Sequence, residues 1–182
     1  MRDLYWQNLL LGSTASYAPW LRDHGSLTRR IQQRCQQFSV QPVRSGLARV
    51  AFDEASTLGF ANDRLAFSRE VFLFADGKPV VFAHSACAER DSRGAWHAIR
   101  GLGNRSLGTL LFTHPLVKRH PLHYKKLQPQ HPLYRSACAG LSIAPQFLWA
   151  RRSLFYLKDA PLLVTEVFLP GILQLNEISV AN

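Results

Sequence analysis

The stretch "REVFLFADGKPVVFAHSAC" (residues 69–87) decides the fold class of this chain. Two runs rich in branched and aromatic residues flank Asp76-Gly77, a dipeptide that strongly favours a tight hairpin turn. A second pair of such runs fills "FLWARRSLFYLKDAPLLVTEVFL" (147–169) and is expected to turn at Lys158-Asp159-Ala160. Hairpins join antiparallel neighbours, and no regular strand–helix–strand alternation is present. The sequence therefore predicts an α+β fold with a single antiparallel sheet.

The rest of the chain is predicted to contain short helices, one further strand pair and a long loop. The expected elements, in chain order, are a helical region over residues 13–37 that breaks at Gly25 and restarts with Ser26 as N-cap, a strand pair over 38–55 around Ser45-Gly46, short helices over 89–103 and 106–112, and an irregular surface loop over 113–148. We expect one domain over residues 1–182, with a core from about 20 to 170 and a C-terminal tail over 171–182.

Composition and cysteine content favour a globular protein of a reducing compartment. Hydrophobic residues make up 47% of the 182 residues, which favours a packed core. No apolar run approaches the ~20 residues that a membrane-spanning helix needs. The three cysteines, Cys35, Cys87 and Cys138, are scattered and odd in number, so neither a disulfide framework nor a structural zinc site is predicted. We expect a cytoplasmic protein without stable membrane insertion, and a monomer.

Positive charge is concentrated in one region of the chain. The formal net charge is +10, and the segment from Ser92 to Lys158 contains eleven Lys and Arg residues but no Asp or Glu. Such a region could attract nucleic acid, an anionic membrane surface or a small polyanion, or it could simply form a solvated basic face. No nucleic-acid-binding motif accompanies the charge, so we expect no nucleic-acid partner.

Two charged residues interrupt apolar strand patterns. Strand alternation places Glu166 on one face together with Leu162, Val164 and Phe168. Arg69 shares a face with Val71 and Leu73 in the same way. A buried carboxylate needs a cationic partner, and a guanidinium is suited to hold a carboxylate through two parallel hydrogen bonds. Arg69 and Glu166 are therefore candidates for opposite sides of one pocket, with a charge at the end of an edge strand as the alternative for Arg69.

Other kinds of site find less support in the sequence. Free backbone amides at the start of the 106–112 helix could hold an anion, although this signal alone is weak. Four histidines lie within the proline-rich segment 113–148, at His114, His120, His123 and His131. Three of the four precede proline, which disfavours ligand spacing on a helix, so a surface loop is favoured over a metal site. The sequence contains no GxSxG, GxxxxGK[ST], GxGxxG or HExxH motif.

Three segments together resemble the chorismate pyruvate-lyase (chorismate lyase) family. They are "SREVFLFADGKPVVFAHS" (68–85), "SLGTLLF" (106–112) and "LWARRSLFYLKDAPLLVTEVFLP" (148–170), and "GSLTRRIQQ" (25–33) matches more loosely. The resemblance runs from about Trp20 to Pro170. It implies a sheet of about six antiparallel strands with helices packed on one side, and a small, enclosed site without metal or cofactor.

The resemblance also implies a reaction and four site residues. The reaction is the cleavage of chorismate to 4-hydroxybenzoate and pyruvate, which supplies ubiquinone biosynthesis. Arg69 and Glu166 are implied as catalytic and substrate-binding residues, and Leu107 and Leu27 as backbone ligands, although many members carry Met at the position of Leu27. Either Glu166 accepts the C4 proton, or it orients the 4-hydroxyl while the enolpyruvyl group takes the proton internally.

A non-enzymatic binding module for aromatic carboxylates is the main alternative, because the family fold resembles the effector domains of bacterial transcription regulators. Those effector domains follow a DNA-binding winged helix, and we identify no such domain before residue 20. The sequence also gives an expectation for one variant. If Glu166 faces a cavity, Glu166→Gln should preserve the fold and reduce activity, because an amide is less costly to bury than an unpaired carboxylate.

Overall fold

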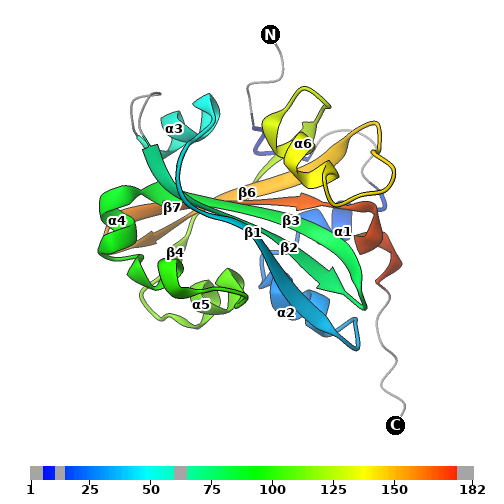
Figure 1. Ribbon diagram of the computed structural model, residues 1–182, viewed down its shortest axis with the longest axis horizontal. Coiled ribbons are helices and arrows are strands. Elements are labelled where there is room, and N and C mark those ends of the chain that lie inside the picture. The colour runs from blue at the N-terminus through cyan, green and yellow to red at the C-terminus, as the bar shows by residue number, and fades with distance from the viewer. Residues whose placement is uncertain (1–5, 11–14, 60–64, 176–182) are drawn as a thin grey trace.

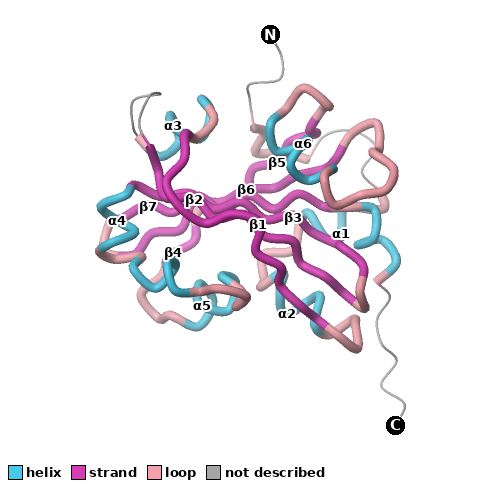
Figure 2. The backbone as a smooth tube through the Cα atoms, viewed as in Figure 1, coloured by secondary structure: helices cyan, strands magenta, loops and turns pink. Residues whose placement is uncertain are grey.

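The computed structural model of the chain describes residues 6–10, 15–59 and 65–175 (Figure 1). Helices and strands are interspersed along the chain, and the strands lie together across the middle of the molecule with helices around them (Figure 2). In chain order the elements are α1 (Ala18–Leu21), α2 (Leu27–Gln32), β1 (Phe38–Arg49), α3 (Phe52–Leu58), β2 (Leu65–Ala75), β3 (Lys78–Ala88), α4 (Glu89–Arg93), η1 (His97–Gly101), α5 (Leu107–Thr113), β4 (Lys118–Arg119), β5 (His123–Leu127), α6 (Pro132–Cys138), β6 (Leu148–Leu157), β7 (Ala160–Phe168) and η2 (Pro170–Gln174).

All strands belong to one antiparallel sheet in the order β1-β2-β3-β7-β6-β4, with β5 also pairing β6. β4 lies opposite Phe155 and Tyr156 of β6, and β5 lies opposite residues 148–152 of the same strand. The two short strands therefore follow one another along a single edge of β6. The sheet has seven strands but is six positions wide, so the predicted α+β class and the size of the sheet are confirmed.

The two predicted hairpins form the centre of the sheet. Asp76 and Gly77 connect β2 to β3 with φ angles of 49° and 77°, the positive values that a type I′ turn requires. The second hairpin turns at Lys158 and Asp159, with φ angles of 49° and 62°. Ala160 already pairs with Leu157, so this turn has two residues instead of the three expected.

The prediction of a strand pair over residues 38–55 is wrong. Phe38–Arg49 is one strand whose residues pair with β2 along its whole length, apart from an irregularity between Pro42 and Arg44. Gly46 lies inside this edge strand, opposite Ser68, and does not form a turn. A helix, α3, follows directly, because Glu54 accepts a hydrogen bond from the Ala51 amide at 3.1 Å and so closes the first turn.

The segment 113–148 is not the irregular surface loop that we expected. It contributes β4, β5 and α6, and Tyr124, Leu127 and Leu133 within it are buried. The outer edge of β6 has backbone groups that need partners, and this segment supplies them. The single helix expected over 89–103 is divided into α4 and η1.

The early helical region follows its predicted outline. The break at Gly25 separates α1 from α2, and Ser26 caps α2 by accepting a hydrogen bond from the Arg29 amide at 3.3 Å. The expected first residues of this region, 13 and 14, lie outside the described residues. The predicted helix over 106–112 is confirmed as α5, with Ser106 at its N-cap.

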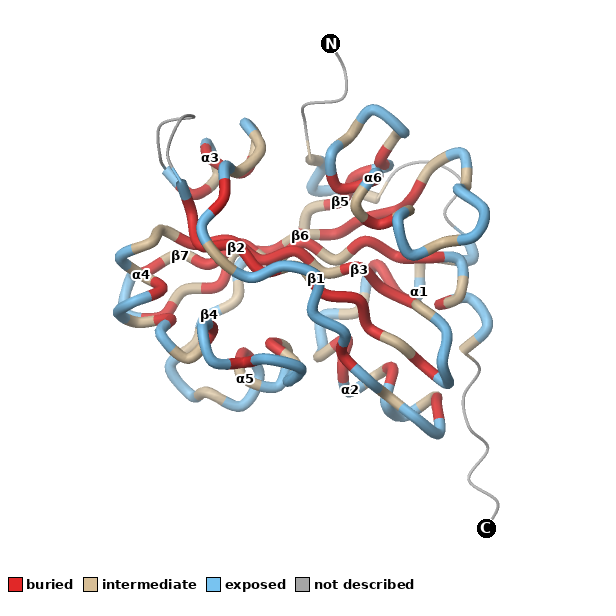
Figure 3. The backbone as a smooth tube through the Cα atoms, in the orientation of Figure 1, coloured by how far each residue is buried: buried red, intermediate tan, exposed pale blue. Residues whose placement is uncertain are grey.

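Helices cover both faces of the sheet, not one side as the resemblance implied (Figure 1). α1, α2 and α5 lie on one face, and α3 and α6 lie on the other, where α3 contacts β3 and β7 and α6 does the same. Burial is concentrated in the central strands and on the inner sides of these helices, whereas β1 at the edge is mostly exposed (Figure 3).

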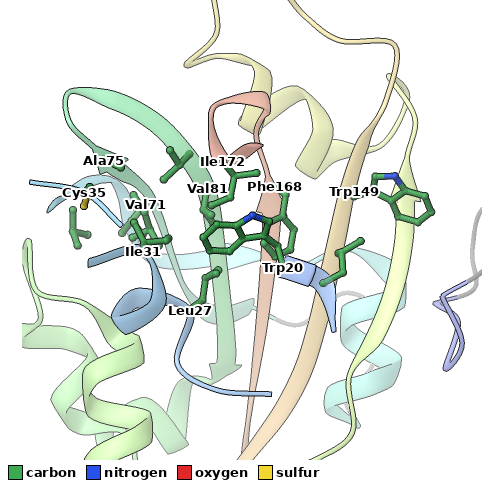
Figure 4. Packing of buried hydrophobic residues seen from close by; sticks show 14 of the residues in the cluster. Trp20, Leu27, Ile31, Cys35, Val71, Ala75, Val81, Trp149, Phe168 and Ile172 are labelled. Atoms are coloured by element: carbon green, nitrogen blue, oxygen red, sulfur yellow. The ribbon is translucent and has the colours of Figure 1, made fainter. Parts of the chain in front are cut away.

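The largest core cluster fixes α1 and α2 against the sheet. Trp20 from α1 and Ile31 from α2 pack with Val71 of β2 and Phe168 of β7, as Figure 4 shows. Ile31 and Phe168 are fully buried. Removing apolar surface of this kind from water stabilises a fold by roughly 25 cal/mol per Å². This cluster therefore holds the two helices over the part of the sheet that carries Arg69 and Glu166.

Candidate active site

A cavity of about 50 Å³ lies between the α1/α2/α5 face of the sheet and the helices α2 and α5. Its wall is mostly apolar with a few polar groups, which is the usual make-up of a small-molecule site. The lining residues are Leu27, Thr28, Val40, Arg69, Val71, Leu73, Ala83, His84, Ser85, Ser106, Leu107, Gly108, Leu111, Phe112, Arg119, Ser153, Phe155, Val164 and Glu166. All four site residues implied by the resemblance, Arg69, Glu166, Leu107 and Leu27, are among them.

The two helices above the cavity are joined directly. The Thr28 and Ser106 hydroxyls lie 2.6 Å apart and form a hydrogen bond between α2 and the N-cap of α5. Gly108 permits this approach, since a Cβ there would come within 2.7 Å of the Thr28 hydroxyl. Leu27 and Leu107 are the first residues of their helices, where backbone amides have no partner four residues earlier. The helix starts thus place both amides at the cavity.

Glu166 has a cationic partner that the sequence reading did not identify. Arg151, its cross-strand neighbour on β6, donates from Nε to Oε2 of Glu166 at 2.5 Å. Arg151 is fully buried, whereas the side chain of Glu166 is 19% exposed. No described residue donates to Oε1 of Glu166. The carboxylate therefore has one oxygen anchored in the protein and one available to the cavity.

Arg151 also connects Glu166 to the end of α1. Its Nη1 donates to the carbonyl oxygens of Trp20 at 2.9 Å, Asp23 at 2.5 Å and, more weakly, Leu21 at 3.4 Å. The last carbonyls of a helix have no partner within that helix, and a buried guanidinium satisfies them here. The side chain of Arg151 thus caps the C-terminal end of α1 and also orients the carboxylate of Glu166 at the cavity.

Arg69 is buried without a carboxylate partner among the described residues. Its Nη2 donates to the carbonyl oxygens of Gly103 and Arg105, both at 2.9 Å, which fixes the guanidinium beside the start of α5. Burial lowers the pKa of Arg69. A buried guanidinium held only by neutral carbonyls retains its full attraction for an anion. This is the charge that a carboxylate ligand would neutralise.

Arg119 of β4 provides a second guanidinium at the cavity, besides that of Arg69. It was not identified from the sequence. Its Nη1 donates to the carbonyl oxygen of His24 at 2.7 Å, while its Nε is buried without a hydrogen-bond partner. Phe112 and Phe155 lie beside the guanidinium, with ring centroids 5.5 and 5.4 Å away. Burial lowers the pKa of Arg119, and Glu166 acts in the opposite direction. Of the basic residues in the segment 92–158, Arg119 alone lines the cavity.

His84 is among the residues that line the cavity, but its side chain lies on the opposite face of the sheet, between two carboxylates. The ring nitrogens of His84 lie 3.2 Å from Glu54 of α3 and 3.2 Å from Glu70 of β2. Burial alone would lower the pKa of His84, but Glu54 and Glu70 outweigh this effect and raise it to about 10. The cluster joins α3 to β2 and β3 directly behind Arg69, the neighbour of Glu70 in the chain.

Three of the four histidines of the segment 113–148 have separate local partners. His131 caps α6, His114 accepts a hydrogen bond from the Leu116 amide, and the ring of His120 lies 4.7 Å from that of Tyr156. Within the described parts of the chain, no three His, Cys, Asp or Glu side chains are placed to hold a metal ion. In the same parts, no helix is long and apolar enough to cross a membrane.

Solved structures with a similar fold include transcription regulators and an effector domain of one of them. The effector domain of PhnF from Mycobacterium smegmatis matches with a TM-score of 0.58 and 14% identity over 81% of this chain and 90% of that one. A GntR-family transcriptional regulator from Bacillus cereus matches with a TM-score of 0.56 and 12% identity, over 81% and 99% of the two chains. At such low identity this likeness concerns the fold alone.

Similarity in sequence is much closer to a different group of proteins. The chain is 55% identical over 157 residues to a probable chorismate pyruvate-lyase of Nitrosospira multiformis, which covers 86% of this chain and 87% of the relative. It is 43% identical to a protein of the same name in Methylobacillus flagellatus over 98% of this chain and 99% of the relative. The model of the family described as chorismate lyase matches residues 5–178. The chain, with its cavity between sheet and helices, therefore belongs to the chorismate lyase family.

Proposed function

We propose that the protein cleaves chorismate to 4-hydroxybenzoate and pyruvate. Its relatives are named probable chorismate pyruvate-lyases, which supports chorismate as the substrate and pyruvate as a product. The observation that carries this proposal is the placement of Arg69 and Glu166 around one apolar cavity. Arg69 has no carboxylate partner among the described residues, and Glu166 has an oxygen that faces the cavity. Chorismate carries a ring carboxylate and, across the ring, a 4-hydroxyl group, so it offers an anion to the first residue and a donor to the second.

In this arrangement the ring carboxylate binds Arg69 together with the amides of Leu27 and Leu107. Both amides belong to helix starts that line the cavity. The 4-hydroxyl donates to Oε1 of Glu166, while Oε2 stays with Arg151. Apolar side chains such as Val71 and Phe155 surround the ring and exclude water, which strengthens each polar contact.

The proposed reaction is an elimination. The ether bond between C3 and the enolpyruvyl oxygen breaks, and its electron pair leaves with that oxygen. The C4–H bond supplies the electron pair for the new ring double bond, so that the ring becomes aromatic. The C4 proton passes either to Glu166, in which case the released enolpyruvate takes a proton from solvent at its methylene carbon, or directly to that carbon. By either route the methylene carbon becomes the methyl group of pyruvate. The protein's contribution is to position, desolvate and move one proton.

The test is to mix the purified chain with chorismate, without added cofactor. We expect 4-hydroxybenzoate by ultraviolet absorbance and pyruvate by coupling to lactate dehydrogenase, in equal amounts. Binding of chorismate without either product would support a non-enzymatic binding module of the same fold. Chorismate deuterated at C4 separates the two proton routes, because only the internal route retains the deuterium in the methyl group of pyruvate. The 4-hydroxybenzoate formed would feed ubiquinone biosynthesis.

A further inference from the structure

We propose that Arg119 binds the second carboxylate of the substrate, the one on the enolpyruvyl side chain. This inference rests on the proposed function and assigns a further substrate-binding residue to the same cavity. Neither the sequence patterns nor the resemblance pointed to Arg119, because it lies on a strand of only two residues.

The sheet register directs Arg119 toward the cavity. Arg119 pairs with Phe155 of β6, and residues that pair across two strands project from the same face. Ser153 and Arg151, two and four residues before Phe155 on β6, project from that face as well. Arg151 pairs with Glu166 in turn. Arg119 therefore shares the cavity face with Glu166, and both line the cavity.

The guanidinium of Arg119 lies at the Glu166 side of the site. Arg119 donates to the carbonyl oxygen of His24, and Arg151 donates to that of Asp23, the preceding residue. Besides the burial that lowers it, the pKa of Arg119 is raised by Glu166 and lowered by Arg151, so its guanidinium lies near both, and Arg151 is in contact with Glu166. Arg69, in contrast, is anchored to the carbonyls of residues 103 and 105. The cavity thus has two cationic groups that are fixed to different parts of its wall.

The charges of the site match a dianion. Arg151 and Glu166 neutralise each other through their ion pair. Arg69 and Arg119 remain, and neither contacts a carboxylate among the described residues. Arg69 is buried, and Arg119 is partly buried with its Nε atom buried and without a hydrogen-bond partner. Two such cations without a carboxylate favour a ligand with two negative charges. Chorismate carries two carboxylates, and its enolpyruvyl group is attached to C3, next to the C4 that we place at Glu166.

The position of the enolpyruvyl group makes Arg119 selective for substrate over product. 4-Hydroxybenzoate retains the ring carboxylate and the hydroxyl group but has lost the second carboxylate. It can therefore contact Arg69 and Glu166 but leaves Arg119 unpaired. If Arg119 served only to hold the His24 carbonyl, its loss would disturb both ligands to the same extent.

The experiment compares Arg119→Met with Lys118→Met. Lys118 is the exposed neighbour on the same strand, so both variants lose one positive charge from β4. The ligands are chorismate, 4-hydroxybenzoate and 3-(1-carboxyvinyloxy)benzoate, which has both carboxylates on a ring that is already aromatic and cannot eliminate. For Arg119→Met we expect a roughly 10- to 100-fold rise in KM for chorismate and in Kd for the aromatic dianion. The Kd of 4-hydroxybenzoate should stay within about twofold of wild type.

Arg119→Lys gives a second variant, which retains a charge but not the planar fork, and should show a smaller effect in the same pattern. Binding of 4-hydroxybenzoate reports that the folded site is present in each variant. The assignment is overturned if the dianion binds Arg119→Met as tightly as Lys118→Met, or if both variants of Arg119 weaken 4-hydroxybenzoate and the dianion equally. A wild-type chain that does not convert chorismate contradicts the proposed function instead, and calorimetry with the dianion then still tests Arg119.

Discussion

Replacing Glu166 by Gln tests the centre of the site, because it removes one charge with little change in shape. From the sequence alone, this change is expected to leave the fold intact. The ion pair with Arg151 alters that expectation. Arg151 is fully buried, and Glu166 is the carboxylate that balances its charge. Glu166→Gln therefore leaves a buried guanidinium uncompensated, and we expect a loss of stability together with the loss of activity.

The size of the effect follows from the contacts that remain. Breaking a buried ion pair by removing one partner costs about 3–5 kcal/mol of unfolding free energy. The amide oxygen of Gln still accepts from Nε of Arg151, whose three bonds to backbone carbonyls are unchanged. We therefore expect a loss of about 2–3 kcal/mol, which for a chain of this length lowers Tm by about 4–12 °C. The value of kcat should fall roughly 10²- to 10⁴-fold, as for a lost acid or base.

The assay is thermal unfolding and steady-state kinetics on the same preparation. Glu89→Gln is the matched control, since it makes the same chemical change in an exposed ion pair with Arg93, where the expected cost is about 0.5 kcal/mol or less. In an Arg151→Met background, Glu166→Gln should cost less than about 1 kcal/mol, because the buried charge is already absent. A Tm for Glu166→Gln equal to that of Glu89→Gln would refute the role of the ion pair. A preserved kcat in folded Glu166→Gln would refute the role in the reaction.

Three further results are expected. Arg69→Lys keeps the charge but not the planar fork, so kcat/KM for chorismate should fall about 30- to 150-fold, and near-wild-type kinetics would make Arg69 a structural residue. Added 4-hydroxybenzoate should slow turnover, because it retains the groups bound by Arg69 and Glu166; initial rates unaffected at high micromolar product would indicate an open site. The ion pairs of His84 should make stability depend on pH. The pKa of His84 is raised to about 10, so its contribution is complete below about 6.5, declines as pH rises and is lost above about 10. Tm should therefore fall between pH 7 and 9.5 more steeply in wild type than in His84→Gln, and equal slopes would contradict this assignment.

The parts of the fold that the sequence predicts well are those with strong local signals. Asp76-Gly77 and the 158–159 turn both adopt the positive φ angles that a hairpin needs, and the strands beside them are rich in branched and aromatic residues. The 38–55 and 113–148 segments have weaker local preferences. Gly46 looks like a turn residue but lies in an edge strand, and β5 contains adjacent lysines that hide its alternation. Their structure depends on neighbours that are distant in the sequence.

The charged residues of the cavity differ in how well the sequence predicts them. Arg69 and Glu166 stand out because each interrupts an apolar strand pattern, and the structure brings both to one cavity. Arg119 gives no such signal, since a two-residue strand has no alternation to interrupt. Its position follows from long-range pairing with β6 and from the loop before α2 that its guanidinium binds.

The identity of the cross-strand partner of Glu166 depends on the length of the second turn. With a two-residue turn at Lys158 and Asp159, the strands pair so that Arg151 stands opposite Glu166, as observed. A three-residue turn that includes Ala160 shifts the register by one and places Arg152 there instead. Because a shift of one residue exchanges the two faces of a strand, it would move Arg151 from the cavity face to the opposite one and bring Arg152 to the cavity face. In the observed register Arg152 lies on the face away from the cavity, where it binds Asp53 of α3. The type of turn therefore decides which of two adjacent arginines joins the site.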